Sequence, residues 1–180
     1  MDVSRFIERL MLEPGYRDQI VHIQDIPERE ARYGELMSPL PPRVAKVLED
    51  TGIERFYTHQ VQAIDAIRGG QDVAIVTSTA SGKTLCYNVP VLERLVTNPN
   101  AKALYLFPTK ALAQDQLRGL VRYVELDPSL PMIPGTYDGD TPPNARRKLR
   151  DEGNIILTNP DMLHQGILPR HPSWGRFFAN

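Results

Sequence analysis

The 180-residue sequence has little cysteine, no long apolar run and almost no net charge, and each absence excludes a class of protein. Cys86 is the single cysteine, which rules out an internal disulfide framework and a zinc site made of cysteines alone. No apolar run approaches the roughly 18 residues that a membrane-spanning helix needs, and the acidic, amphipathic start is unlike a signal peptide. We therefore expect a cytoplasmic protein that makes no contact with membranes.

The formal charge of -1 argues against a broadly cationic, histone-like protein. It leaves nucleic-acid binding open, because a local basic patch can supply the necessary field. The apolar content of 41% is ordinary for a folded domain, and the length allows one substantial core. Composition alone therefore predicts a globular domain without naming a ligand.

The spacing of apolar residues divides the chain into an appendage, residues 1–35, and a larger alternating part, residues 36–180. The appendage is expected to contain one amphipathic helix that ends at Pro14. In the larger part, helices at 38–50 and 58–68 precede strands at 72–76, 103–107, 132–137 and 154–158, each followed by a helix. Strands that alternate with helices predict an α/β fold, in which helices cover both faces of a parallel sheet.

The strongest motif, at 77–84, directly follows the expected strand at 72–76. A buried strand, a Gly-Lys-Thr turn and a helix form the layout of a phosphate-binding loop, although Thr77 stands where the strict pattern has glycine. Lys83 would place its charge at the β- and γ-phosphates, and the Thr84 hydroxyl would ligate Mg²⁺, so we assign catalytic roles to both. The N–H groups expected to face the phosphates are those of Thr79, Ala80, Ser81 and Gly82.

An upstream segment is expected to bind the base of the nucleotide. The Gln60 amide can both donate to and accept from the N7/N6 edge of adenine, and Phe56 or Tyr57 can stack on the ring. Taken alone, a glutamine at the start of a helix is more simply a solvent-facing residue. Its position 23 residues before Lys83 makes it a candidate adenine reader, and the predicted cofactors are therefore ATP and Mg²⁺.

Three further segments follow later strands and should meet at one edge of the sheet, where open parallel sheets bind ligands. Hydroxyl groups, helix-start N–H groups and a lysine could contact a nucleic-acid backbone there. The residues assigned to this path are Pro108, Thr109, Lys110, Gln114, Gly139, Asp140, Thr158, Asn159, Pro160 and Asp161. The plainer explanation for the first segment is a helix cap at Thr109 with a solvated Lys110. For the other two it is a helix cap followed by proline, with Thr141 as the expected cap before Pro142, and the basic run at 146–150 is more simply a solvated helix face.

Taken in order, these segments resemble the first RecA-like domain of superfamily 2 helicases. The correspondence covers the glutamine motif at 57–60, motif I at 77–84, motif Ia at 108–112, the glycine-containing motif at 137–141 and motif Ib at 158–161. Residues 36–180 are most similar to the MrfA family of mitomycin-repair, RecQ-like DNA helicases. The resemblance implies ATP-dependent translocation on single-stranded DNA in DNA repair, in the 3′ to 5′ direction. The sequence leaves open whether RNA is also bound.

The resemblance also shows what these 180 residues do not contain. Such helicases hydrolyse ATP with an acidic Asp-Glu-x-His box on the strand after motif Ib, and the sequence has no such box. A second RecA-like domain is also missing from it. We therefore expect a RecA-like domain that is incomplete at its C-terminal end, and a chain that binds nucleotide weakly and hydrolyses ATP negligibly.

Two other classes of function stay open at this point. A different P-loop enzyme, such as a small-molecule kinase, would need an acceptor-binding lid and an acidic strand end, and neither is visible. A non-catalytic nucleic-acid-binding module would keep the loop only as a vestige. The intact Gly82, Lys83 and Thr84 argue against the vestigial loop.

Overall fold

The computed structural model describes residues 2–27 and 30–179, which fall into two compact units, Met1–Ala31 and Arg32–Asn180. The smaller unit contains the expected amphipathic helix, α1 (Val3–Met11), which begins at Asp2 because that side chain accepts a hydrogen bond from Arg5 N. The division after Ala31 lies slightly before the boundary expected at residue 35. None of the helices in the described ranges is long and apolar enough to cross a membrane.

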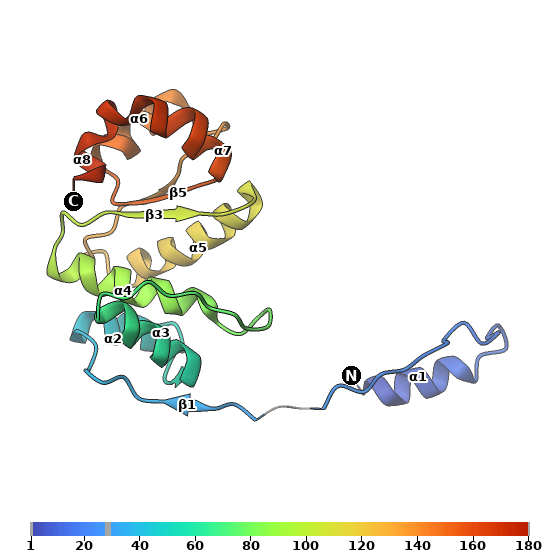
Figure 1. Cartoon of the computed structure of the whole chain (residues 1–180). Coiled ribbons are helices and arrows are strands. Elements are labelled where there is room, and N and C mark those ends of the chain that lie inside the picture. The colour runs from blue at the N-terminus through green and yellow to red at the C-terminus, as the bar shows by residue number, and fades with distance from the viewer. Residues whose placement is uncertain (1, 28–29, 180) are drawn as a thin grey trace. The chain divides into compact units, whose positions relative to one another are not determined.

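The larger unit is built on a parallel three-stranded sheet in the order β3-β5-β4 (Figure 1). Its strands are β3 (Ala103–Leu106), β4 (Pro134–Thr136) and β5 (Ile155–Thr158). Tyr105 of β3 and Thr136 of β4 both lie opposite Leu157 of β5, so the three strands are in register at this level. All four residues of β5 are buried, as expected for a central strand covered on both faces.

Helices pack on both faces of this sheet, so the α/β class predicted from the sequence is confirmed. Ile155 and Leu157 point into the larger core, which they share with helices α2 to α5, whereas Ile156 points into a second core with Trp174 and Phe177. This alternation follows the two-residue period of a strand. The helices are α2 (Pro42–Asp50), α3 (Thr58–Arg68), α4 (Lys83–Thr97), α5 (Lys110–Leu126), α6 (Pro143–Glu152), α7 (Pro160–Met162) and α8 (Gly175–Phe178). Figure 1 shows α4 and α5 on one side of the sheet and α6 and α8 on the other.

The strand predicted at 72–76 is not formed, and this prediction was wrong. The segment runs without regular structure between α3 and α4, with Val73 exposed and Val76 95% exposed. A strand needs a hydrogen-bonding neighbour, and no strand of residues 2–27 or 30–179 pairs with this segment. Apolar content made the segment look like a buried strand, but the pairing that would bury it lies outside the reach of local sequence.

A short antiparallel pair, not expected from the sequence, forms at the start of the larger unit. Strands β1 (Tyr33–Gly34) and β2 (Phe56–Tyr57) bring Tyr33 opposite Tyr57. Near the C-terminal end, a π-helical turn (Leu163–Ile167) and a 3₁₀ segment (Leu168–Trp174) lead into α8. These connections place Trp174 and Phe177 in the second core.

Candidate nucleotide and nucleic-acid sites

The loop at 77–82 folds around the ammonium group of Lys83. Nζ donates to Ser78 O at 2.5 Å and to Thr77 O at 3.2 Å, and it lies 3.4 Å from Ser81 Oγ. Lys83 is also the first residue of α4, so the N-terminus of a 15-residue helix faces the same loop. Ala80 adopts a left-handed backbone conformation with φ +56°, which is a strained conformation for a residue with a side chain. A lysine and a helix N-terminus behind a strained loop make a site suited to phosphate.

Gly82 joins this loop to the segment predicted to read the base. Its backbone has φ +74°, and a Cβ atom placed on it would lie 2.5 Å from Gln60 Nε2. Gln60 is 1% exposed; its Nε2 donates to Gly82 O at 2.9 Å, and its Oε1 accepts from Tyr57 N at 2.8 Å. The Gln60 amide therefore links the two segments, and only glycine allows so close an approach.

A cavity of about 340 Å³ opens where these two segments meet. It is lined by Tyr57, Gln60 and Gly82, together with Tyr33 and Arg55. The rings of Tyr33 and Tyr57 stack with centroids 5.2 Å apart, and the Arg55 guanidinium lies 3.9 Å from the centre of the Tyr33 ring. A volume of this size, flanked by aromatic rings, can accept a planar base.

Phe56, which was grouped with Tyr57 and Gln60 at the sequence level, does not line this cavity. It is half-buried and packs against the larger core. Tyr33 takes the aromatic place beside Tyr57 instead, although it was not predicted as a site residue. Only the β1–β2 pairing reveals it, and two-residue strands leave no readable pattern in a sequence.

The Thr84 hydroxyl, predicted to ligate Mg²⁺, is directed toward helix α5. Its Oγ1 donates to Gln116 Oε1 at 3.4 Å, and the hydroxyl of Tyr87 donates to the same atom at 3.2 Å. Burial raises the pKa of Tyr87, so this phenol stays protonated as a donor. Thr84 is thus half-buried beside the loop, and its long contact to Gln116 leaves the hydroxyl able to turn toward a metal ion.

The segments assigned to the nucleic-acid path meet at one edge of the sheet, as predicted. Strands β3, β4 and β5 are parallel, and the segments at 107–110, 137–141 and 159–161 follow their carboxyl ends. Thr109 caps α5 by accepting from Leu112 N at 3.2 Å, and Asn159 caps α7 by accepting from Met162 N at 2.8 Å. The capping roles considered at the sequence level are therefore present, and they fix the helix starts at this edge.

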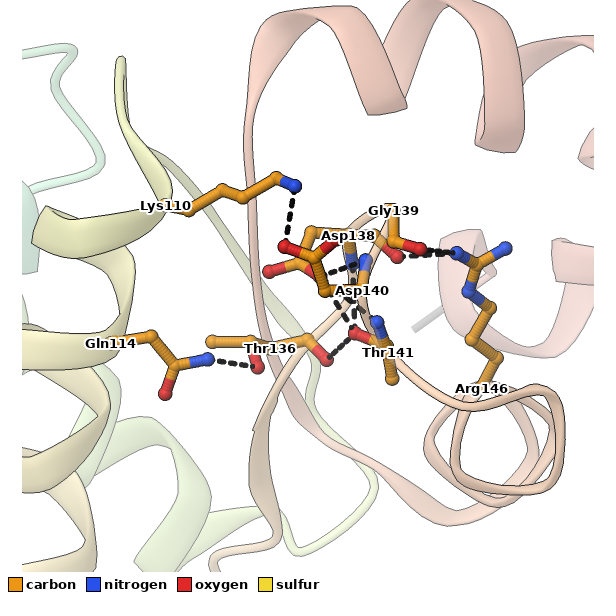
Figure 2. A network of polar contacts seen from close by, with 8 residues as sticks. All are labelled: Lys110, Gln114, Thr136, Asp138, Gly139, Asp140, Thr141 and Arg146. Carbon is orange, nitrogen blue, oxygen red and sulfur yellow. Dashed lines mark hydrogen bonds and ion pairs between the residues drawn. The ribbon is translucent and has the colours of Figure 1, made fainter.

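The loop after β4 is held by a network of polar contacts (Figure 2). The Asp138 carboxylate is buried, and its Oδ1 accepts from Asp140 N at 2.9 Å and from Thr141 N at 3.1 Å. Arg146 Nη2 donates to Asp138 O at 2.6 Å and to Gly139 O at 2.8 Å. From the other side, Gln114 Nε2 donates to Thr136 Oγ1 at 3.0 Å. The backbone of this loop is thus fixed by the protein itself.

Arg146 therefore acts within the fold, whereas its sequence pattern favoured a solvated face. Thr141, expected to cap α6, instead places its hydroxyl 3.0 Å from Thr136 O, and Pro142 occupies the capping position. Both differences have one cause. The short loop after β4 turns back on that strand, and the side chains of Thr141 and Arg146 donate hydrogen bonds to backbone oxygens there. Such a closure is not visible in the spacing of residues.

An ion pair between two exposed side chains, those of Lys110 and Asp140, lies at this edge of the sheet. Lys110 Nζ lies 2.6 Å from Asp140 Oδ2, and both side chains reach into solvent. The hydrogen bond to Asp140 raises the pKa of Lys110. Pro108, Gln114, Gly139, Pro160 and Asp161 are also exposed here. Thr158 is buried, and its hydroxyl donates to Tyr137 O at 2.6 Å, so this side chain serves the fold.

Replacing Asp138 by asparagine is expected to lower the free energy of unfolding by about 1–3 kcal/mol, because a neutral amide oxygen accepts more weakly from Asp140 N and Thr141 N than the buried carboxylate does. Thermal unfolding followed by circular dichroism would measure it. Asp140→Asn in the same loop is the matched control, since its exposed side chain should change stability by no more than about 0.5 kcal/mol. Equal stabilities of the two variants would contradict a locking role for Asp138.

Comparison with known protein families finds a match that covers most of the larger unit. Residues 57–177 match the model of the DEAD/DEAH box helicase family. This range begins at β2, includes the loop at 77–82 and contains all three segments at the sheet edge.

Two similar curated proteins are helicases by name. The chain is 44% identical over 163 residues to "Uncharacterized ATP-dependent helicase YprA" of Bacillus subtilis, covering 91% of this chain and 22% of that protein. It is 42% identical over 176 residues to "ATP-dependent helicase HRQ1" of Saccharomyces cerevisiae, covering 97% of this chain and 16% of that protein. The chain thus spans about a fifth of the length of these relatives.

Solved structures agree in fold. The crystal structure of DUF1998 helicase MrfA bound to DNA and AMPPNP superposes on 98% of this chain and 24% of its own, with a TM-score of 0.86 and 42% identity. The DEAD-box helicase Mss116 bound to single-stranded RNA and UDP-BeF shares the fold at a TM-score of 0.61 and 20% identity. The RecA-like fold expected from the sequence is confirmed.

Proposed function

The chain belongs to the DEAD/DEAH box helicase family, and from this premise we propose that it supplies the first nucleotide- and nucleic-acid-binding domain of an ATP-dependent DNA helicase. The observation that carries the proposal is the junction at Gly82. There the phosphate-binding loop and the base cavity meet through one buried glutamine. The resemblance to the mitomycin-repair family suggests that the whole protein acts in DNA repair.

In this proposal ATP–Mg²⁺ spans the loop and the cavity. The adenine would lie beside Tyr57, with the Gln60 amide at the back of the cavity and Phe56 supporting the segment from the core. The N–H groups of Thr79, Ala80, Ser81 and Gly82 and the Lys83 ammonium would hold the phosphates. Thr84 would turn its hydroxyl to the metal ion, which neutralises charge on the phosphates when bound. The close approach at Gly82 keeps the loop next to the cavity, and phosphate oxygens would replace Thr77 O and Ser78 O as acceptors for the Lys83 ammonium.

Single-stranded DNA would run along the carboxyl edge of the sheet. Pro108, Thr109, Lys110, Gln114 and Gly139 come from β3, α5 and the loop after β4, and Asn159, Pro160 and Asp161 come from the segment after β5. Helix starts and a lysine contact backbone phosphates without regard to sequence. Thr158 would hold the segment after β5 in place through its bond to Tyr137 O, and it would not contact the DNA. DNA is favoured over RNA because MrfA, at 42% identity, was crystallised with DNA.

Binding of ATP by these 180 residues is not expected to lead to its hydrolysis. Their sequence contains no Asp-Glu-x-His box, and no other carboxylate is proposed to position the attacking water. We therefore expect the isolated chain to bind ATP–Mg²⁺ and release it unchanged. Robust DNA-stimulated ATP hydrolysis by the purified chain would contradict this expectation.

Nucleotide titration of the wild-type chain and the Lys83→Ala variant tests the proposed site. Loss of the charge-assisted contacts to phosphate should weaken the binding of a fluorescent ATP analogue with Mg²⁺ by about 10- to 100-fold. Lys46→Ala is a suitable control, because Lys46 is an exposed lysine of α2 that pairs with Asp50. If the Lys83→Ala substitution left nucleotide affinity unchanged, the loop would be vestigial and the proposed function would be wrong.

A further inference from the structure

The ion pair between Lys110 and Asp140 lies on the proposed path of the nucleic-acid strand. Lys110 is the first residue of α5, a 17-residue helix, so its ammonium and the helix N-terminus both favour an anion at this point. An anion is already present there, because Asp140 Oδ2 lies 2.6 Å from Lys110 Nζ. A carboxylate and a phosphate are alternative partners for one lysine.

The two neighbouring aspartates of the loop play different parts (Figure 2). Asp138 is 5% exposed and binds the loop backbone, whereas the Asp140 side chain is 78% exposed and contacts only Lys110 among the polar groups drawn. Because Asp138 and Arg146 fix the backbone, the Asp140 carboxylate can leave Lys110 by rotating about its own side-chain bonds. Lys110, whose side chain is 48% exposed, can follow a new partner in the same way.

Asp140 is therefore poorly suited to contact the nucleic acid itself. An aspartate carboxylate is an acceptor only and would repel a phosphate next to it. Gly139 brings the loop backbone close to the same lysine, since a Cβ at that position would lie 3.7 Å from Lys110 Nζ. A phosphate that reaches Lys110 either displaces the Asp140 carboxylate or binds another N–H of the same ammonium beside it, and in both cases the carboxylate opposes the phosphate.

We propose that Asp140 is a built-in competitor of the nucleic-acid phosphate at Lys110, and that it lowers the affinity of the path for single strands. This inference rests on the proposed function and refines the part of Asp140 in it. Asp140 sets how readily a strand is released, because the carboxylate recaptures the lysine when a phosphate leaves. If Asp140 instead oriented Lys110 for phosphate, the Asp140→Asn substitution would weaken the binding of single strands.

The test measures the binding of a fluorescein-labelled oligothymidylate of about 20 nucleotides to the 180-residue chain by fluorescence anisotropy. Asp140→Asn should tighten binding about two- to fivefold at roughly 50 mM salt, which is the range expected when an exposed ion pair no longer competes. The gain should fade at roughly 300 mM salt, where such pairs are screened. Asp115→Asn on α5 is the matched control, because Asp115 forms an exposed pair with Arg118 and its loss changes the net charge equally.

A second pair of variants shows whether the effect passes through Lys110. Lys110→Met alone should weaken binding and reduce the slope of log affinity against log salt by about 1. Adding Asp140→Asn to Lys110→Met should give no more gain than Asp115→Asn gives, because the contested lysine is gone and only the change in net charge is left. Circular dichroism melts of all variants would show that each is folded.

The possible outcomes separate this inference from the function on which it rests. No binding by the wild-type chain would defeat both. Wild-type binding that Asp140→Asn weakens, leaves unchanged, or tightens only as much as Asp115→Asn does would overturn the inference alone. A gain in the Lys110→Met background that exceeds the gain from Asp115→Asn would overturn it as well, because the carboxylate would then act elsewhere.

Discussion

The Gly82→Ala variant is expected to lose about 2–5 kcal/mol of unfolding free energy and its measurable affinity for nucleotide. Two costs add at this position. A residue with a side chain is strained by about 1–2 kcal/mol at φ +74°. The new Cβ would also collide with Gln60 Nε2, so the buried amide must give up its bonds to Gly82 O and Tyr57 N at a further cost of about 1–3 kcal/mol.

Urea denaturation and nucleotide titration would measure the two effects in the same preparation. Gly119→Ala provides the control, because Gly119 lies in α5 with nothing within 4 Å of its added Cβ. That substitution should stabilise the chain by about 0.5–1 kcal/mol, since alanine favours a helix over glycine. A Gly82→Ala protein with wild-type stability and affinity would show that the Gln60–Gly82 contact is dispensable.

Trp174→Ala should produce the largest loss of stability, about 3–5 kcal/mol. Trp174 is 2% exposed at the centre of the second core, and its ring makes edge contacts with Tyr137 at 4.9 Å and Phe177 at 5.6 Å between centroids. Its removal leaves a void beside Ile156 on one face of the central strand. Because Tyr137 directly precedes the locked loop, affinity for single-stranded DNA should fall together with stability.

Phe178→Ala is the control for this prediction. Phe178 also contacts the Trp174 ring, with centroids 6.3 Å apart, but it is 47% exposed. Its truncation should cost about 1 kcal/mol or less, because little apolar surface returns to water. Urea denaturation midpoints compare the two variants directly, and similar losses would mean that the second core does not depend on Trp174.

Local sequence was sufficient for most helices and for the strands that are buried in the sheet. The limits of α3 and the Thr109 cap of α5 were predicted as found, because caps and apolar spacing act within a few residues. The segment at 72–76 has the same local appearance as β5, yet it forms no strand. What differs is the partner: β5 lies between β3 and β4, and such pairing cannot be inferred from a single segment.

For the candidate site as well, the sequence indicated residue types but not the contacts that these residues make. The sequence drew attention to Gln60 and to the loop after β4 as binding segments, and that assignment stays a prediction. It could not show that Gln60 is buried against Gly82, that Asp138 and Arg146 lock the loop, or that Tyr33 stacks on Tyr57. Each of these contacts joins residues that only the folded chain brings together.

The unpaired apolar segment at 72–76 has a practical consequence for the behaviour of the chain in solution. Val73 and Val76 are exposed on a segment without regular structure, and β3 pairs on one side only within the described part of the chain. Such features recruit strands from other molecules. With a pI near 6.4, the chain carries little charge to keep copies apart at neutral pH. Concentrated samples should therefore remain dispersed better at about pH 8.5 than at pH 7, because added negative charge opposes such self-association.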